Sequence, residues 1–442
     1  MPYNTLTKLP PGPLPVQDVL PFPTDGGLSN GVANKMAPSD RAVHDWYRFV
    51  LSFPPHLVRE YTGRFGLQPG QTLLDPFCGT GTTLVESKLM GIDSIGIEAN
   101  PMAHFASSVK TDWKTDPARL LQHSFRIMTL ASPLLESASL RTLPEDSHKL
   151  LLTDSIAPRV LHKLLLLREA IDNRGDDECV RHSRLALAKT AVSCSNLHFG
   201  PEVGVSRLRK TDAPVLETWL GEMERIAQDL RHVGDCEATS QVVCADSRQL
   251  SNVLAPNSIS GVFTSPPYPN EKDYTRTTRL ESVLLGFARD RKELQLLKRN
   301  LLRSNTRNVY KGDGDDEWVA KFESIQAIAA RIEARRVELG KTSGFERLYA
   351  RVAKLYFGGM ARHLSELRPF LKPGAFLGYV VGDQASYLQV MIRTGQILGE
   401  IAESLGYRVA GIDLFRTRLA TATKQQMREE VVVLQWPGGG SL

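Results

Sequence analysis

Residues 72–83 read TLLDPFCGTGTT, and this stretch decides the fold of the chain. Its apolar beginning predicts a short strand, and its glycines predict a turn whose backbone can approach a ligand closely. An apolar helix over 84–90 follows, closed by Gly91, and then a strand over 94–98 that ends in an acid. Together they form one βαβ unit, so the sequence predicts the nucleotide-binding half of a doubly wound parallel sheet.

The glycine turn favours a bound nucleotide without deciding which one. The helix after it presents free N–H groups, and Glu98 is placed to accept hydrogen bonds from a ribose diol. The third glycine of the dinucleotide fingerprint is absent. The turn also has no Gly-Lys-Thr sequence, which excludes a phosphate-binding P-loop there. It can hold a dinucleotide or S-adenosylmethionine, or it is an ordinary tight turn.

Further strands extend the sheet. Apolar runs predict them over 241–246, 259–264, 375–381, 407–414 and 430–434, the last two as an antiparallel pair at the far edge. Asp246 ends one strand on the same rim as Glu98. With Ser247 it is placed to read the adenine edge of a cofactor, although a helix N-cap explains it equally well.

The segments between the strands divide the chain into parts. Residues 1–40 are rich in proline, glycine and polar residues, and we interpret them as an extended or disordered arm. Apolar residues at helical spacing predict a helical insertion over 119–238 and a second, basic helical insertion over 287–355. The catalytic core is assigned to 41–118, 239–286 and 356–436.

Composition bounds the class of protein. The chain has 442 residues and a formal net charge of +5, which allows a polyanionic partner without requiring one. Its five cysteines form no C-x-x-C pair, which argues against a disulfide framework or a zinc site, so no metal is expected. The sequence shows no signal peptide and no apolar run of membrane length. We therefore expect a cytoplasmic protein.

A second motif, TSPPY over 264–268, follows directly after an apolar strand. The adjacent prolines fix the backbone and have no N–H. The Ser265 hydroxyl and the Pro266 carbonyl can accept hydrogens from an exocyclic amine, whose lone pair is otherwise delocalised into its ring. Tyr268 can stack on that ring, as an aromatic clamp does on a flipped base. Catalysis would then be positioning plus electrostatics. The alternative is an ordinary proline-rich turn.

These motifs resemble those of the amino-group DNA methyltransferases of the Ser-Pro-Pro-Tyr type. The family implies an α/β fold: a doubly wound, seven-stranded, Rossmann-like, S-adenosylmethionine-dependent methyltransferase sheet, here with two mainly helical insertions. It implies catalytic roles for Ser265, Pro266, Pro267 and Tyr268. It also implies S-adenosylmethionine as cofactor, bound by Phe53, Asp75, Phe77, Cys78, Gly79, Gly81, Thr82, Glu98, Asp246 and Ser247. The serine before Pro-Pro-Tyr is commoner in members that act on cytosine N4.

Basic residues after the proline turn are candidate DNA contacts. Between Arg289 and Lys311, basic residues outnumber acidic ones by eight to two. We predict backbone contacts from Arg276, Arg279, Arg299 and Arg303. A solvated helix face is an equally good reading of the basic stretch. The second insertion is favoured as the part that reads bases, because it is the more basic.

The sequence thus predicts a site-specific enzyme that methylates the N4 amine of a flipped cytosine in double-stranded DNA. Three alternatives stay open: an N6-adenine DNA methyltransferase, an RNA amino-methyltransferase, and a catalytically silent DNA-binding subunit. A separately encoded cognate restriction endonuclease is a partner that such a resemblance implies. The recognition sequence and the oligomeric state are not encoded in any motif.

Overall fold

The computed structural model describes residues 36–49, 52–135, 139–175, 178–199, 203–234, 236–270, 272–419 and 426–439. Most of the arm predicted over 1–40 lies outside these ranges. Of that arm only 36–40 is described, and it contains the short 3-10 helix η1 (Pro38–Asp40).

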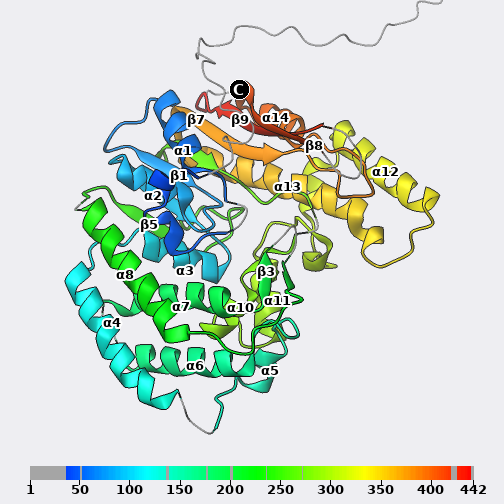
Figure 1. Ribbon diagram of the computed structural model, residues 1–442. Coiled ribbons are helices and arrows are strands. Elements are labelled where there is room, and N and C mark those ends of the chain that lie inside the picture. The colour runs from blue at the N-terminus through cyan, green and yellow to red at the C-terminus, as the bar shows by residue number, and fades with distance from the viewer. Residues whose placement is uncertain are drawn as a thin grey trace, which may run out of the picture.

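A seven-stranded sheet organises the fold, in the order β5-β2-β1-β6-β7-β9-β8 (Figure 1). Its strands are β1 (Thr72–Asp75), β2 (Asp93–Ile97), β5 (Ser240–Val243), β6 (Ile259–Thr264), β7 (Leu371–Gly382), β8 (Arg408–Leu419) and β9 (Gln426–Gln435). Neighbours pair in parallel except β9, which is antiparallel to both β7 and β8. The predicted doubly wound α/β sheet is therefore confirmed, including the antiparallel pair at its edge.

The strand order reverses between β1 and β6, so the chain leaves a crevice at the carboxyl ends of these two strands. Both strands are central, and both of their faces are buried. Successive side chains of a strand point to opposite faces, so neighbouring residues join different apolar clusters. Leu74 and Val262 join one apolar cluster, whereas Leu73 and Phe263 join another. The two strands thus end at neighbouring points of one rim, where the glycine turn and the proline turn begin.

Helices cover both faces of the sheet. On one face α1 (Pro55–Arg64) packs through Leu57, Val58 and Tyr61. On the other, α13 (Tyr349–Leu367) and α14 (Thr394–Ser404) pack against the sheet. Because α13 covers the sheet from residue 349 onward, the boundary predicted at 355 falls within a core helix. Two more helices flank the glycine turn's half of the sheet: α2 (Thr82–Leu89) and α3 (Pro101–Lys110).

The first predicted insertion is mainly helical and forms a block below the sheet in Figure 1. It contains α4 (Pro117–Ala131), η3 (Ser132–Leu134), α5 (Glu145–His148), α6 (Pro158–Asp172), α7 (Val180–Cys194), the pair β3 (Leu197–Phe199) and β4 (Val203–Val205), and α8 (Val215–Val233). Its apolar residues share one cluster with Trp46, Val85 and Met102. The block is therefore packed onto the sheet's helices through a continuous core.

The second predicted insertion is less regular and carries several short helices. After α9 (Tyr274–Thr277) and α10 (Arg279–Leu284), the chain forms α11 (Arg291–Arg299), η4 (Thr306–Asn308), η5 (Asp315–Val319), α12 (Glu323–Glu338) and η6 (Glu346–Leu348). The remaining short helices are η2 (His44–Trp46) and η7 (Arg368–Phe370). No helix among the described residues is long and apolar enough to cross a membrane.

Candidate active site

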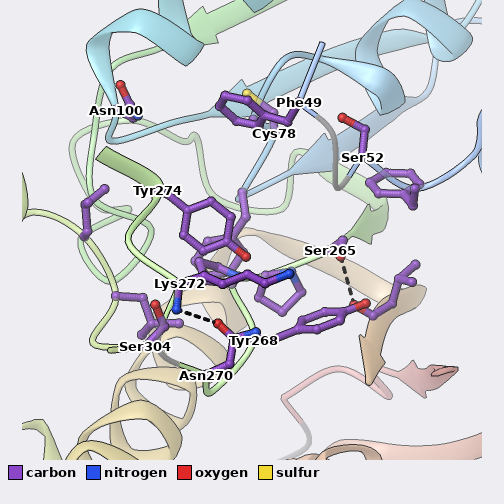
Figure 2. Close-up of a pocket in the computed structure, with 18 of the residues that line it drawn as sticks. Phe49, Ser52, Cys78, Asn100, Ser265, Tyr268, Asn270, Lys272, Tyr274 and Ser304 are labelled. Atoms are coloured by element: carbon purple, nitrogen blue, oxygen red, sulfur yellow. Dashed lines mark hydrogen bonds between the residues drawn. The ribbon is translucent and has the colours of Figure 1, made fainter. Parts of the chain in front are cut away.

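One cavity of about 790 Å³ opens where the predicted glycine turn and proline turn meet. Eleven predicted site residues line it: Phe53, Phe77, Cys78, Gly79, Thr82, Glu98, Ser247, Ser265, Pro266, Pro267 and Tyr268. Figure 2 shows Cys78 and Asn100 on one side of this space, Tyr268 and Asn270 on another, and Tyr274 between them. The structure thus brings both motifs, far apart in the sequence, to one site.

Two predicted residues of the glycine turn lie behind the cavity wall. Asp75 is buried, and its Oδ1 accepts a hydrogen bond from Thr264 Oγ1 at 2.6 Å and from Phe77 N at 3.1 Å. Burial raises the pKa of Asp75 to about 6. Gly81 has φ +83° and precedes α2; a Cβ there would lie 2.9 Å from Ser107 Cβ, so only glycine fits. Both residues shape the turn.

Glu98 lines the cavity from the end of β2. Its Oε2 accepts from Gly79 N at 2.9 Å, and its Oε1 accepts from Asn100 N at 2.7 Å. Burial outweighs these two donors and raises the pKa of Glu98 to about 7. Each carboxylate oxygen has a second lone pair, so the carboxylate can still accept from a diol.

The proline turn places Ser265 as an acceptor. Its hydroxyl donates to Val380 O of β7 at 3.1 Å, the dashed line beside Ser265 in Figure 2. With its hydrogen directed to that carbonyl, Oγ keeps lone pairs that can accept hydrogens from a ligand, and the Tyr268 hydroxyl lies within reach of the same oxygen. The Thr264–Asp75 hydrogen bond holds the same turn against the end of β1. The glycine turn and the proline turn are therefore fixed relative to each other.

Tyr268 has its ring against the end of β7. A Cβ at Gly382 would lie 3.0 Å from Tyr268 Cε2, so glycine makes room for the ring. Burial, aided by the nearby carboxylate of Glu429, raises the pKa of the Tyr268 hydroxyl. Tyr268 is therefore a neutral phenol with an apolar ring face, the form that suits stacking.

Several cavity residues were not predicted. After the proline turn come Asn270, Lys272 and Tyr274, and burial raises the pKa of Tyr274 to about 12. The second insertion contributes Asn300, Leu301, Leu302, Ser304, Asn305 and Asn308, and the sheet edge contributes Phe415, Arg416, Arg418, Met427 and Glu429. The aromatic ring of Tyr274, six residues past a predicted catalytic residue, was the signal that could have found it.

The predicted adenine reader, Asp246, does not line the cavity. Its carboxylate is held by Arg248, with Nη2 2.7 Å from Oδ2 and Nε 2.9 Å from Oδ1. Arg248 in turn contacts Asp315. The geometry corrects the prediction: the half-buried Asp246 belongs to an ion-pair network with the buried Arg248 and Asp315, and only its neighbour Ser247 lines the cavity.

The four predicted DNA-contacting arginines differ in their surroundings. Arg303 is buried; it forms an ion pair with Asp313 at 2.8 Å and donates to backbone carbonyls, so the prediction of a phosphate contact is wrong for it. Arg279 donates to Thr275 O at 3.1 Å and to Leu150 O at 3.3 Å. Arg276 is half-buried, and Arg299 is exposed beside the Tyr310 ring.

Comparisons with known proteins agree with this site. Residues 34–107 match the family model described as DNA methylase. The chain is 26% identical to the type II methyltransferase M.BsoBI of Geobacillus stearothermophilus, over 90% of this chain and 85% of that one. It is 23% identical to the type II methyltransferase M.AvaI of Anabaena variabilis, over 90% and 86%. It is 24% identical to the type II methyltransferase M.MvaI of Kocuria varians, over 56% and 63%.

The fold and these matches define a methyltransferase of the Rossmann-like class. The chain is similar to the amino-group DNA methyltransferases, as its motifs predicted, and the relatives that it matches over most of its length are type II enzymes. Within the described residues, no group of three or more His, Cys, Asp or Glu side chains is arranged to hold a metal ion.

Proposed function

We propose that this protein transfers a methyl group from S-adenosylmethionine to the N4 amine of cytosine in double-stranded DNA. The observation that carries this proposal is the environment of Ser265. Its hydroxyl hydrogen is committed to Val380 O, so its oxygen is an acceptor directed at the space beside Tyr268. Serine at this position of the motif is the cytosine-favouring residue of the resemblance.

The proposed chemistry follows from the turn. Two acceptors, Ser265 Oγ and the Pro266 carbonyl, accept hydrogen bonds from the two hydrogens of the amine. These hydrogen bonds draw the nitrogen toward tetrahedral geometry. The lone pair then localises on the nitrogen and becomes nucleophilic. Tyr268, held against Gly382, stacks on the base and fixes the direction of attack. No covalent enzyme intermediate is needed.

The residues around the glycine turn fit the proposed cofactor, which supplies an electrophilic methyl group. Glu98 offers acceptors for a ribose diol, and Phe53 and Phe77 offer apolar surface on the cavity wall. Thr80 Oγ1, also on this wall, is buried and has no hydrogen-bond partner among the residues that the structure describes. An unpaired buried hydroxyl costs about 1–3 kcal/mol, and a polar ligand group would relieve that cost.

We propose DNA as the polyanion that approaches this cavity, with Arg276 and Arg299 among its backbone contacts. Arg299 is exposed on α11, whose other end carries Arg291 and Lys292. The type II relatives support a role in restriction and modification, with the cognate endonuclease on a separate chain.

One experiment tests the proposal and its rivals. The purified protein is incubated with methyl-labelled S-adenosylmethionine and either double-stranded DNA or RNA, and the modified nucleosides are identified after digestion. We expect label in N4-methylcytosine from DNA. Label in N6-methyladenine would overturn the choice of base, and label in RNA alone would overturn DNA. Cofactor binding without any labelling would show a silent DNA-binding subunit.

A further inference from the structure

Asn308 carries a buried acceptor that has no partner among the described residues. Its side chain lines the cavity and is 3% exposed, and its Oδ1 makes no hydrogen bond within the described chain. Its Nδ2 donates to Leu302 O at 3.3 Å, which fixes the amide so that the free atom is the oxygen. A buried acceptor left unpaired costs about 1–3 kcal/mol. The site is therefore built for a ligand that brings a donor.

Leu302 O, the carbonyl that accepts from the Asn308 amide, places Asn308 beside the loop that follows β5. A Cβ at Gly359 of α13 would lie 2.4 Å from Leu302 Cδ1 and 3.7 Å from Arg248 Cδ, so these two side chains face the same point of α13. Leu302 and Ser247 both line the cavity. Asn308 thus lies on the side of the cavity that Ser247, the residue after Asp246, also lines.

That side of the cavity lacks the acceptor that the motifs predicted. Asp246 does not line the cavity, and Arg248 uses more of its carboxylate than the donors on Glu98 do: Oδ1 accepts from both N and Nε of Arg248, and Oδ2 accepts from Nη2. Arg248 is anchored a second time by Asp315. An adenine ring presents an exocyclic amine, which is a donor pair and needs an acceptor. Leu301, Leu302 and Phe77 supply apolar wall for the ring itself.

We propose that Asn308 Oδ1 accepts a hydrogen bond from the exocyclic amine of the cofactor's adenine, in place of Asp246. This inference rests on the proposed use of S-adenosylmethionine. It assigns to the second insertion a part in cofactor binding, in addition to any contact with DNA.

The test compares two ligands that differ at the amine-bearing edge of the base, where deamination replaces the amine by a carbonyl and turns the neighbouring ring nitrogen N1 from an acceptor into a donor. S-adenosylhomocysteine and its deaminated analogue S-inosylhomocysteine are titrated into the full-length protein by calorimetry. The wild type is expected to bind the adenosyl ligand about tenfold or more tightly, because the analogue turns a carbonyl toward Oδ1; tenfold corresponds to about 1.4 kcal/mol. Asn308→Leu is expected to lose this preference, with nearly all of the change in the adenosyl ligand.

The matched control is Asp246→Asn, which alters the residue that the motifs favoured and is expected to keep the preference. A ratio of two affinities measured on one preparation is insensitive to the fraction of folded protein, so a partly unfolded variant still gives an answer.

Two outcomes overturn the inference in different ways. An unchanged preference in Asn308→Leu, or its loss in Asp246→Asn alone, refutes the role of Asn308 and leaves the proposed function standing. Failure of the wild type to bind S-adenosylhomocysteine at all removes the proposed function and this inference together.

Discussion

At the scale of single residues, the site works through groups whose neighbours have already used part of their bonding capacity. Ser265 has given its hydrogen to Val380, and Glu98 has accepted two backbone donors. What remains on each is acceptor capacity facing the cavity. The motifs predicted that Ser265 and Glu98 would belong to the site. The acceptor capacity left on each depends on hydrogen-bond partners elsewhere in the fold, so it cannot be read from the sequence.

Tyr268 separates base positioning from cofactor binding. Tyr268→Ala removes the stacking face and is expected to lower turnover about tenfold to a hundredfold, since base stacking contributes about 1–3 kcal/mol. The affinity for S-adenosylhomocysteine should stay within twofold of the wild type. Tyr268→Phe, which keeps the ring, is the control and should retain most turnover. Equal losses in turnover and cofactor affinity would show that Tyr268 is misplaced in the scheme.

Glu281 predicts a pH dependence of stability. Its Oε1 accepts from Tyr47 Oη at 2.6 Å, and its Oε2 is buried with no partner in the described part of the chain. Burial raises the pKa of Glu281 to about 7. Because the folded pKa lies above the unfolded value, this carboxyl's contribution is full below about pH 4.5 and is lost as the pH rises through 7.

Glu281→Gln stays neutral and keeps an acceptor for Tyr47, so it removes that loss. The melting temperature of the variant relative to wild type should increase from pH 5 to pH 8, by about 2 °C or more. Thermal unfolding across this range measures it. A difference that does not vary with pH would contradict the ionisation of Glu281.

At the scale of elements, the hydrogen bond between Thr264 and Asp75 joins the ends of β6 and β1 and so joins the two motifs. Thr264→Val keeps the shape and strand preference but removes the donor. We expect the unfolding free energy to fall by about 1–3 kcal/mol, and most at high pH, where Asp75 is ionised. Denaturant unfolding measures this, with Thr264→Ser as the variant that keeps the hydroxyl. Equal losses in the two variants would rule out the hydrogen bond as the cause.

Elements were predictable where the pattern is local. The strand over 259–264 was predicted with the bounds of β6, because a central strand is a continuous apolar run between turn signals. Asp246 and Arg303 failed for a common reason. A charged residue in a sequence does not reveal its partner, and here Arg248 and Asp313 take those charges. Asn308 had no motif at all, since its role depends on a loop that the fold brings to the cavity.

At the scale of the whole molecule, the contrast between Arg299 and Arg303 tests where DNA lies. Arg299→Ala is expected to weaken DNA binding and to reduce the slope of log affinity against log salt by about one, with stability unchanged. Arg303→Ala breaks a buried ion pair and should instead lower stability by about 3–5 kcal/mol. Fluorescence anisotropy at several salt concentrations and denaturant unfolding measure the two effects. An unchanged salt slope in Arg299→Ala would place the DNA elsewhere.

The segment over 300–308 belongs to the part of the chain that is most basic, yet it also walls the cavity shared by both motifs. This has a consequence for engineering. A chimaera can take this segment from a relative in order to acquire a new target sequence. Such a chimaera also exchanges part of the cavity proposed to bind the methyl donor. DNA target preference and affinity for the methyl donor would therefore change together. A successful graft must also carry the half of the sheet that contains the relative's matching glycine turn.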